Sequence, residues 1–159
     1  MSVESSDDIK LVDIGANLTH PCFKNDFDEV ITRSKEAGII KLIITGTTEQ
    51  ISEKALELTK KDPDFLYCTT GVHPHDAKDC SEQAMSLIEK LCQDKQCVAV
   101  GECGLDFNRN FSPAEVQKVV FEKQVEVAEK LGKPLFIHER DAHDDMVKIL
   151  SRYVVHNIY

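Results

Sequence analysis

The sequence predicts an α/β fold in which parallel strands alternate with helices that cover them. Two observations indicate this fold: short, continuously apolar runs that are typical of buried strands, and amphipathic segments between those runs. A third observation is that chemically reactive polar residues directly follow the apolar runs. Such a sheet is either doubly wound or closed as a barrel. The length of 159 residues suits one modest domain.

Five segments have the continuous, often β-branched apolar character of strands that are buried on both faces. They comprise residues 11–18, 41–45, 65–72, 97–101 and 135–138. Helices are predicted over residues 27–37, which Gly38 ends, over residues 49–60, and over residues 141–150 at the end of the pattern.

The third and fourth helices have clearer signals at their ends. A capping box of Asp79 and Glu82 is expected to begin the third helix. Ser112 as N-cap and Pro113 at the first position are expected to begin the fourth, which Gly132 ends. The apolar faces of these two helices are predicted to consist of Met85, Ile88, Leu91 and Cys92, and of Val116, Val119, Val120, Val127, Ala128 and Leu131.

The composition excludes several classes of protein. Hydrophobic residues make up 42% and charged residues 30%, so neither a disordered chain nor a fibrous repeat is indicated. No apolar run approaches the roughly 20 residues that cross a bilayer, and residues 1–10 are acidic, so we expect neither membrane insertion nor secretion. The six cysteines lack paired C-x-x-C spacings and are expected to be reduced thiols in the cytoplasm or nucleus. The net charge of −9 disfavours a broad basic surface for nucleic acid.

Polar or small residues lie at or just beyond the C-terminal ends of the five predicted strands. They are Asn17, Gly46, His73, Glu102 and His138. Parallel strands deliver their last side chains to one rim of the sheet, which is where active sites of α/β folds assemble. We therefore expect a functional site at this rim.

Glu102 and His138 are the strongest pair of candidates. Glu102, accompanied by Asp106, follows one predicted strand in the segment GECGLDF, and His138 ends the next strand. A carboxylate oxygen and an imidazole nitrogen on neighbouring strands are suitable ligands for a divalent ion such as Zn²⁺, Mn²⁺ or Mg²⁺. The alternatives are a salt-bridged or solvated glutamate and a hydrogen-bonded core histidine.

Two further segments add candidates at the same rim. The segment GVHPH provides His73 and His75 around a proline that restrains the backbone; the alternative is a turn whose histidines face solvent. Arg140 follows His138 closely, and a planar guanidinium beside a metal suits a phosphate. Alternatively, Arg140 and Asp141 pair with neighbours on the rim.

Four motifs, in order, closely resemble the TatD-type metal-dependent deoxyribonucleases. They are DIGANL, TGVHPHD, GECGLDFNRNFS and HERDAH, and the resemblance extends over about residues 11–152. It implies a TIM-barrel hydrolase of the amidohydrolase-like superfamily that acts on DNA as a 3′–5′ exonuclease or related nuclease.

The resemblance also implies roles for individual residues and a cofactor. Glu102 and His138 would be ligands of a divalent ion (Mg²⁺, Mn²⁺ or Zn²⁺). His73 and Asp106 would be catalytic and line the substrate side, and His75 and Arg140 would bind substrate, which would be DNA. The metal and a few local cations can neutralise a reacting phosphate, so the acidic surface is compatible with a nuclease.

The sequence departs from the family pattern in two ways. Many members have Asp-x-His-x-His in the first strand, whereas Gly15 and Asn17 occupy the histidine positions here, so we expect one well-held ion and a weak second site. A complete barrel has eight strands and about 250 residues, whereas about five strand-helix units are predicted here. The family's further ligand histidine and its catalytic aspartate are expected beyond Leu150. His156 is a candidate for that histidine; the alternative is that it belongs to an unrelated terminus.

The expected organisation is therefore a polar leader (residues 1–10), the N-terminal part of a barrel (residues 11–152) and an atypical tail (residues 153–159). From this pattern we expect a truncated or alternatively spliced nuclease. The alternative function is a catalytically inactive fragment that acts as a binding or regulatory protein and self-associates through its open sheet edge. A third alternative keeps the metal but hydrolyses amides or esters.

Overall fold

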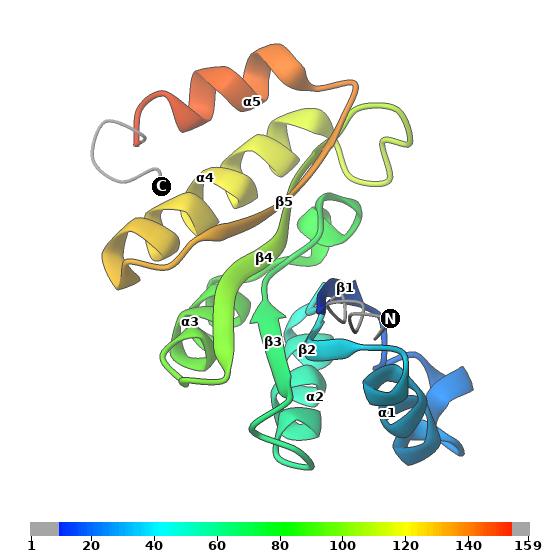
Figure 1. The fold of residues 1–159 in the computed structure, drawn as a ribbon. Helices are drawn as coiled ribbons and strands as arrows, with labels where there is room; N and C mark the ends of the chain where they lie inside the picture. The colour runs from blue at the N-terminus through cyan, green and yellow to red at the C-terminus, as the bar shows by residue number, and fades with distance from the viewer. Residues whose placement is uncertain (1–9, 154–159) are drawn as a thin grey trace, which may run out of the picture.

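The computed structural model describes residues 10–153, which form one parallel sheet with its helices (Figure 1). The strands are hydrogen-bonded in the order β1-β2-β3-β4-β5, which is also their order along the chain, and all four pairs are parallel. Their bounds are β1 Leu11–Ala16, β2 Ile39–Ile44, β3 Leu66–Thr70, β4 Cys97–Asp106 and β5 Leu135–Arg140. A doubly wound sheet reverses its strand order at a switch point, and this sheet does not. The barrel alternative is therefore confirmed, as a curled half-barrel of five strands.

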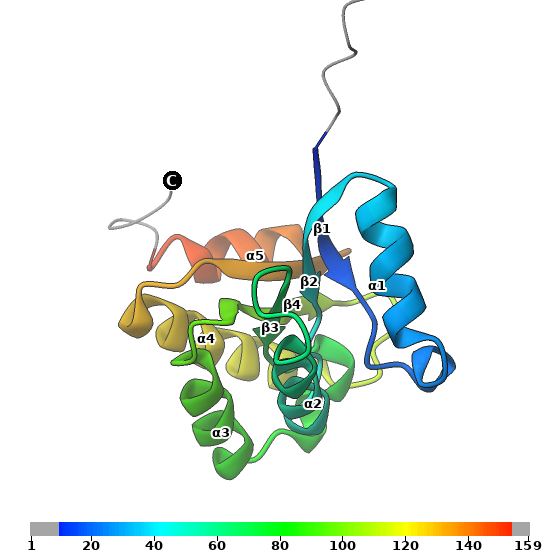
Figure 2. The same ribbon diagram turned by 60° about the horizontal axis from the view of Figure 1, so that its bottom comes forward.

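The helices lie around the outside of the curled sheet (Figure 2). The five α-helices are α1 Phe27–Glu36, α2 Glu49–Thr59, α3 Glu82–Cys92, α4 Ala114–Leu131 and α5 His143–Leu150, and two short 3₁₀ helices are η1 Pro21–Phe23 and η2 Pro74–Asp79. None of the helices within residues 10–153 is long and apolar enough to cross a membrane. Residues 1–9 and 154–159, with most of the expected leader, most of the expected tail and His156, lie outside the described residues.

The sheet curls so strongly that residues of its two edge strands approach each other. A methyl group added at Gly15 on β1 would lie 3.4 Å from the ring of Phe136 on β5. On the outer side, the core consists of two clusters. The larger is centred on β2, β3 and β4 and the helices that cover them, and the smaller joins the end of β4 to α4 and α5 around the fully buried Phe121. Helix α4 contributes to both clusters and therefore connects them.

The structure corrects the prediction that the first strand is buried. Leu11, Val12 and Ile14 of β1 are 51%, 48% and 59% exposed. The physical reason is that β1 is an edge strand with a single neighbour, β2. Continuous apolar character in a sequence does not tell whether a strand is central or at an edge.

Three predictions about helix ends and faces were also wrong. Ser81, not Asp79, caps α3, since its hydroxyl accepts a hydrogen bond from the Ala84 N–H at 3.1 Å. Ser112 does not cap α4, because its buried hydroxyl bonds to the segment containing His75 instead. Val119, expected on the apolar face of α4, is exposed. In contrast, the expected stop of α4 at Gly132 is confirmed by its left-handed backbone, with φ of 63°.

Strand β4 is longer than predicted, and this changes the position of Glu102. The strand continues through residues 102–106, so that Glu102 lies within it rather than beyond its end. Gly104 allows this continuation, because its φ is +141° and a Cβ there would lie 2.0 Å from the His138 carbonyl oxygen. Glycine is required for this close approach of β5 to β4.

Candidate metal centre

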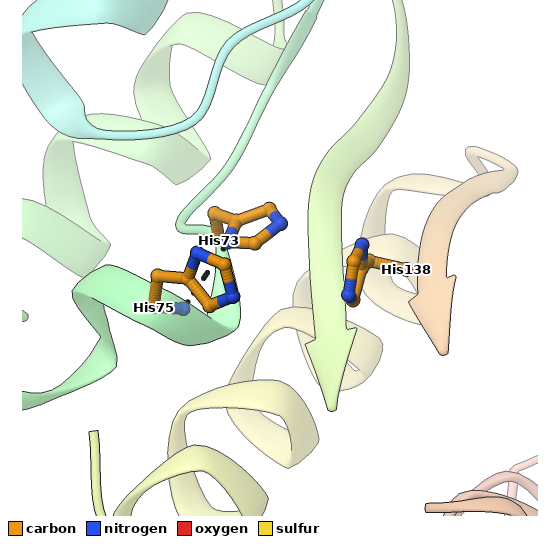
Figure 3. A group of neighbouring side chains, drawn as sticks. All are labelled: His73, His75 and His138. Carbon is orange, nitrogen blue, oxygen red and sulfur yellow. Dashed lines mark hydrogen bonds between the residues drawn. The ribbon is translucent and has the colours of Figure 1, made fainter. Parts of the chain in front are cut away.

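Three segments of the chain bring the predicted site residues together. His73 follows β3 and caps η2, and His75 lies within η2. Glu102 lies on β4 and His138 on β5. Figure 3 shows the imidazoles of His73 and His75 on one side of β4 and that of His138 on the other, and one ligand nitrogen from each ring lies within 4.8 Å of the others.

Glu102 is the carboxylate closest to His138 and His73 on the side away from Asp106. Its Oε1 lies 3.3 Å from Nδ1 of His138 and 3.6 Å from Nε2 of His73. Its backbone N–H donates to the Gly46 carbonyl oxygen at 2.7 Å, so the end of β2 also fixes its position. The predicted pair of Glu102 and His138 thus converges in the structure.

Asp106 lies behind the histidines and is completely buried. Its Oδ1 accepts the N–H groups of Asn108 at 3.0 Å and Arg109 at 2.9 Å. Its Oδ2 lies 2.7 Å from Nε2 of His75 and 3.3 Å from Nε2 of His138. Burial alone would raise the pKa of Asp106, but the hydrogen bonds from Arg109, His75 and Asn108 outweigh it and hold the pKa well below its usual range. The carboxylate is therefore ionised.

The ionised Asp106 determines the tautomer of His138. An ionised carboxylate can only accept hydrogen bonds, so the nitrogens of His75 and His138 that face it must both carry protons. In neutral His138 this leaves a lone pair on Nδ1, and that lone pair faces Glu102 Oε1 at 3.3 Å. Two acceptors at this distance repel each other unless a proton or a metal ion lies between them. A histidine held from behind by a carboxylate is also the usual arrangement of a metal ligand.

His73 has the opposite arrangement of its two nitrogens. Its Nδ1 accepts the backbone N–H of His75 at 3.1 Å, so in the neutral ring the proton is on Nε2, which faces Glu102. Burial, followed by the charges of His138 and His75, lowers the pKa of His73 to about 4. His73 is therefore a neutral proton donor that faces the space between the site residues.

The residues present fit a divalent ion. Two ligands bound to one tetrahedral ion at about 2.0–2.1 Å lie about 3.3–3.4 Å apart. The separation of 3.3 Å between His138 Nδ1 and Glu102 Oε1 agrees with this value. The mixed nitrogen and oxygen donors are compatible with Zn²⁺ and Mn²⁺, and the carboxylate with Mg²⁺.

Two buried glutamines on α4 fix the backbone of the site, and sequence reasoning missed both. Gln117 accepts from the Asp106 N–H at 2.8 Å and donates to the Asp106 carbonyl at 3.0 Å. Gln124 accepts from the Val72 N–H at 2.8 Å and donates to the Val72 carbonyl at 3.0 Å, directly before His73. The signal that could have revealed them is a pair of amides, seven residues apart, among the apolar positions of an amphipathic helix.

The remaining predicted residues lie at the rim. Arg140 ends β5 and is exposed, and neither it nor Asp141 forms an ion pair within residues 10–153. The alternative that these two residues pair with rim neighbours therefore holds for Asp141, which accepts a hydrogen bond from the Asn108 side chain at 2.8 Å, and is not observed for Arg140. Asn17 follows β1 and is exposed.

Comparisons with known proteins agree in pointing to one family. The family model described as TatD related DNase matches residues 12–158. The chain is 44% identical over 144 residues to the 3'-5' ssDNA/RNA exonuclease TatD of Erwinia tasmaniensis, covering 91% of this chain and 56% of that protein. It is 45% identical to the protein of the same name from Edwardsiella piscicida, covering 91% and 55%. The chain thus spans slightly more than half the length of these curated relatives.

Solved structures with the same fold include a member of this family. A TatD-family hydrolase of Entamoeba histolytica superposes with a TM-score of 0.84 at 28% identity, covering 91% of this chain and 55% of that one. An uncharacterised amidohydrolase of Saccharomyces cerevisiae superposes with a TM-score of 0.79 at 31% identity, covering 92% and 52%.

Proposed function

The chain belongs to the TatD related DNase family, and from this premise we propose that it is a metal-dependent hydrolase that cleaves phosphodiester bonds in DNA as a 3′–5′ exonuclease. The names of its curated relatives, which are 3'-5' ssDNA/RNA exonucleases, support the reaction and the class of substrate. The observation that carries the proposal is the position of His138 between two carboxylates, with Nδ1 3.3 Å from Glu102 and Nε2 3.3 Å from the buried Asp106.

We assign the metal to Glu102 and His138. Glu102 Oε1 and His138 Nδ1 would hold it, and the donor set admits Mg²⁺, Mn²⁺ or Zn²⁺. When bound, a divalent ion supplies an easily deprotonated water and polarises the phosphate. His73 is not a ligand in this assignment, since its Nδ1 is already bonded to the His75 N–H. With Gly15 and Asn17 on β1, a second ion would be held weakly.

The other site residues act on the substrate or on the histidines. Neutral His73 donates its Nε2–H to a phosphate oxygen and positions it. Asp106 is completely buried, so it positions His75 and His138 and does not touch the substrate. Arg140 binds a substrate phosphate, for which it is suited because it is exposed and has no carboxylate partner within residues 10–153. His75 already donates its Nε2–H to Asp106, so it binds a phosphate through Nδ1 only when its ring is protonated.

The test is metal-dependent cleavage of a single-stranded DNA oligonucleotide by the purified chain. Glu102→Ala and His138→Ala should each lose at least about 100-fold in rate and should no longer retain metal during purification. His143→Ala is the matched control, because His143 is an exposed imidazole at the start of α5. Cleavage that persists in both variants and in excess chelator would refute the proposal. Turnover of small esters or amides but not of DNA would favour the hydrolase alternative.

A second candidate function is that of a binding or regulatory protein without catalysis. The exposed apolar side chains of β1 favour it, because an uncovered strand edge pairs readily with another strand. We propose that a second copy of the chain is the partner at this edge. Sedimentation across a concentration series tests it, and metal content together with activity separates it from the nuclease.

We infer an intracellular location, in the cytoplasm or nucleus, from the cysteines. All six are free thiols, and four of them are buried: Cys68, Cys92, Cys97 and Cys103. Free thiols in such numbers suit a reducing compartment.

A further inference from the structure

Unpaired arginines distinguish the rim of the site from the rest of the surface. The chain has four arginines and carries a net charge of −9. Arg33 pairs with Asp26 at 3.5 Å, and Arg152 pairs with Glu122. Arg109 and Arg140, the two at the rim, have no carboxylate partner within the described residues. In an acidic protein, guanidinium groups left without a carboxylate beside a site are available to bind an anionic ligand.

Arg109 belongs to a short, fixed loop between β4 and α4. Its N–H and that of Asn108 bond to Asp106, as described above. Asn110 adopts a left-handed backbone with φ of 51°, and its side chain donates to the Phe107 carbonyl at 2.6 Å. The Phe107 N–H donates to the Arg140 carbonyl at 2.9 Å, which holds the loop beside the end of β5. The loop is therefore built against the site by hydrogen bonds at several points.

Phe111 ends this loop and lies beside His75. Its ring is 4.8 Å from the imidazole of His75, nearly perpendicular to it, and the residue is 54% exposed. The next residue, Ser112, is buried; its hydroxyl donates to the His75 carbonyl at 2.8 Å and accepts from the Lys78 N–H at 3.0 Å. This anchor keeps Phe111 at the surface and against His75. The ring is thus a large apolar group that is held beside a site residue and is more than half exposed.

We propose that Phe111 stacks on the base of the nucleotide whose phosphate occupies the site, and that Arg109 binds an adjacent phosphate. The inference rests on the proposed function. Stacking suits an enzyme that removes nucleotides of any sequence, because every base has a π-face. Phe111 is therefore a substrate-recognition residue that reads the presence of a base and not its identity.

The experiment compares two single-stranded oligonucleotides, one with ordinary nucleotides and one with abasic residues at the 3′ end. Wild-type chain should have a KM about 10- to 100-fold lower for the ordinary oligonucleotide, which corresponds to the stacking free energy of one base. Phe111→Ala should lose this preference mainly through KM, with a much smaller change in kcat, and Phe111→Trp should keep it. Arg109→Ala should weaken binding of both oligonucleotides and reduce the salt dependence. Val147→Ala is the matched control, since Val147 is an apolar residue on α5 that is 50% exposed, close to the exposed fraction of Phe111, and it is not one of the site residues.

The outcomes separate this inference from the proposed function. If wild-type chain cleaves neither oligonucleotide, the proposed nuclease function fails and the stacking inference fails with it. If wild-type chain cleaves DNA but Phe111→Ala keeps the preference for a terminal base, only the stacking inference is overturned. A loss of preference in Val147→Ala as well would also overturn it, because the effect would then not belong to the ring of Phe111.

Discussion

The two sides of the sheet are held together in different ways. On the side of β4, β5 and α4, buried polar side chains bind backbone groups at fixed points: Gln117 binds Asp106 and Gln124 binds Val72. On the side of β1, apolar side chains such as Ile14 face outward without cover. A hydrogen bond specifies both distance and direction, whereas apolar contact is non-directional. Hydrogen bonds therefore fix the geometry of the site on the β4–β5 side of the sheet. The β1 side instead presents exposed apolar side chains that a second molecule can cover.

The two regions therefore differ in function: the β4–β5 side positions the site residues, and the β1 side does not. The side-chain amides of Gln117 and Gln124 each bond to both the N–H and the C=O of one residue, as a neighbouring strand would. Because both glutamines lie on α4, this helix fixes the spacing between the end of β4 and the segment that follows β3. Strand β1, one of the two edge strands, pairs only with β2. If the comparison is right, substitutions on the β4–β5 side change metal binding and stability together, and substitutions on β1 change neither.

The largest effect is expected for Gly104→Ala on β4. A Cβ there would lie 2.0 Å from the His138 carbonyl oxygen, so β5 must move away and take His138 with it. We expect a loss of about 4 kcal/mol or more in the free energy of unfolding, because backbone strain of about 1–3 kcal/mol adds to broken cross-strand bonds. Mn²⁺ affinity, measured by calorimetry, should fall at least about tenfold.

The matched control for this variant is Gly15→Ala on β1. Gly15 has no positive φ, and its added methyl group would meet only the Phe136 ring at an ordinary 3.4 Å. Urea unfolding should therefore show a change within about 0.5 kcal/mol. Equal losses in the two variants would contradict the proposed difference between the two sides.

A smaller but still large effect is expected for Gln124→Leu. Leucine leaves the N–H and carbonyl of Val72 buried without a partner, at a cost of about 2–3 kcal/mol in the free energy of unfolding. Because Val72 precedes His73, the rate of DNA cleavage should also fall by more than the loss of folded protein explains. Gln50→Leu on the exposed surface of α2 is the control, and it should change neither quantity.

These glutamines show where prediction from sequence reached its limit. Strand-helix alternation, the stop at Gly132 and the convergence of Glu102 with His138 all follow from local patterns, so they could be predicted. Gln117 and Gln124 bond to backbone groups of other segments. Every residue type has the same backbone groups, so no sequence pattern predicts which of them a side chain will bind. The prediction that Ser112 caps a helix was wrong for the same reason, because its hydroxyl bonds to backbone groups of η2.

The exposed edge could not be predicted either, for a different reason. Both β1 and β3 were predicted to be buried strands, yet β3 is largely buried and β1 is not. Burial of a strand depends on what lies beside it in the sheet, and strand order is set by the whole chain. The extent of β4 was missed because glycines in GECGLDF are typical of loops, whereas here Gly104 permits the close approach of β5.

Ser112→Ala should have a moderate effect. It removes the hydroxyl that bonds to the His75 carbonyl and the Lys78 N–H, and a cost of about 1–2 kcal/mol in the free energy of unfolding is expected. Because the hydroxyl holds η2 in place, the KM for DNA should rise as well. Ser86→Ala on the exposed face of α3 removes a hydroxyl that bonds only within its own helix. A KM that stays unchanged in Ser112→Ala would show that η2 is held by its other contacts.

The smallest effect on stability is expected for Ile14→Lys on β1. Ile14 is exposed, so its replacement should change the free energy of unfolding by no more than about 0.5 kcal/mol. A lysine on an edge strand opposes pairing with another strand, so self-association measured by sedimentation should decrease. Val147→Lys, an exposed apolar position on α5, should leave self-association unchanged. If Ile14→Lys instead unfolds the chain at low concentration, Ile14 is covered in the folded chain. The β1 side would then contribute to the free energy of unfolding as the β4–β5 side does, which would contradict the comparison.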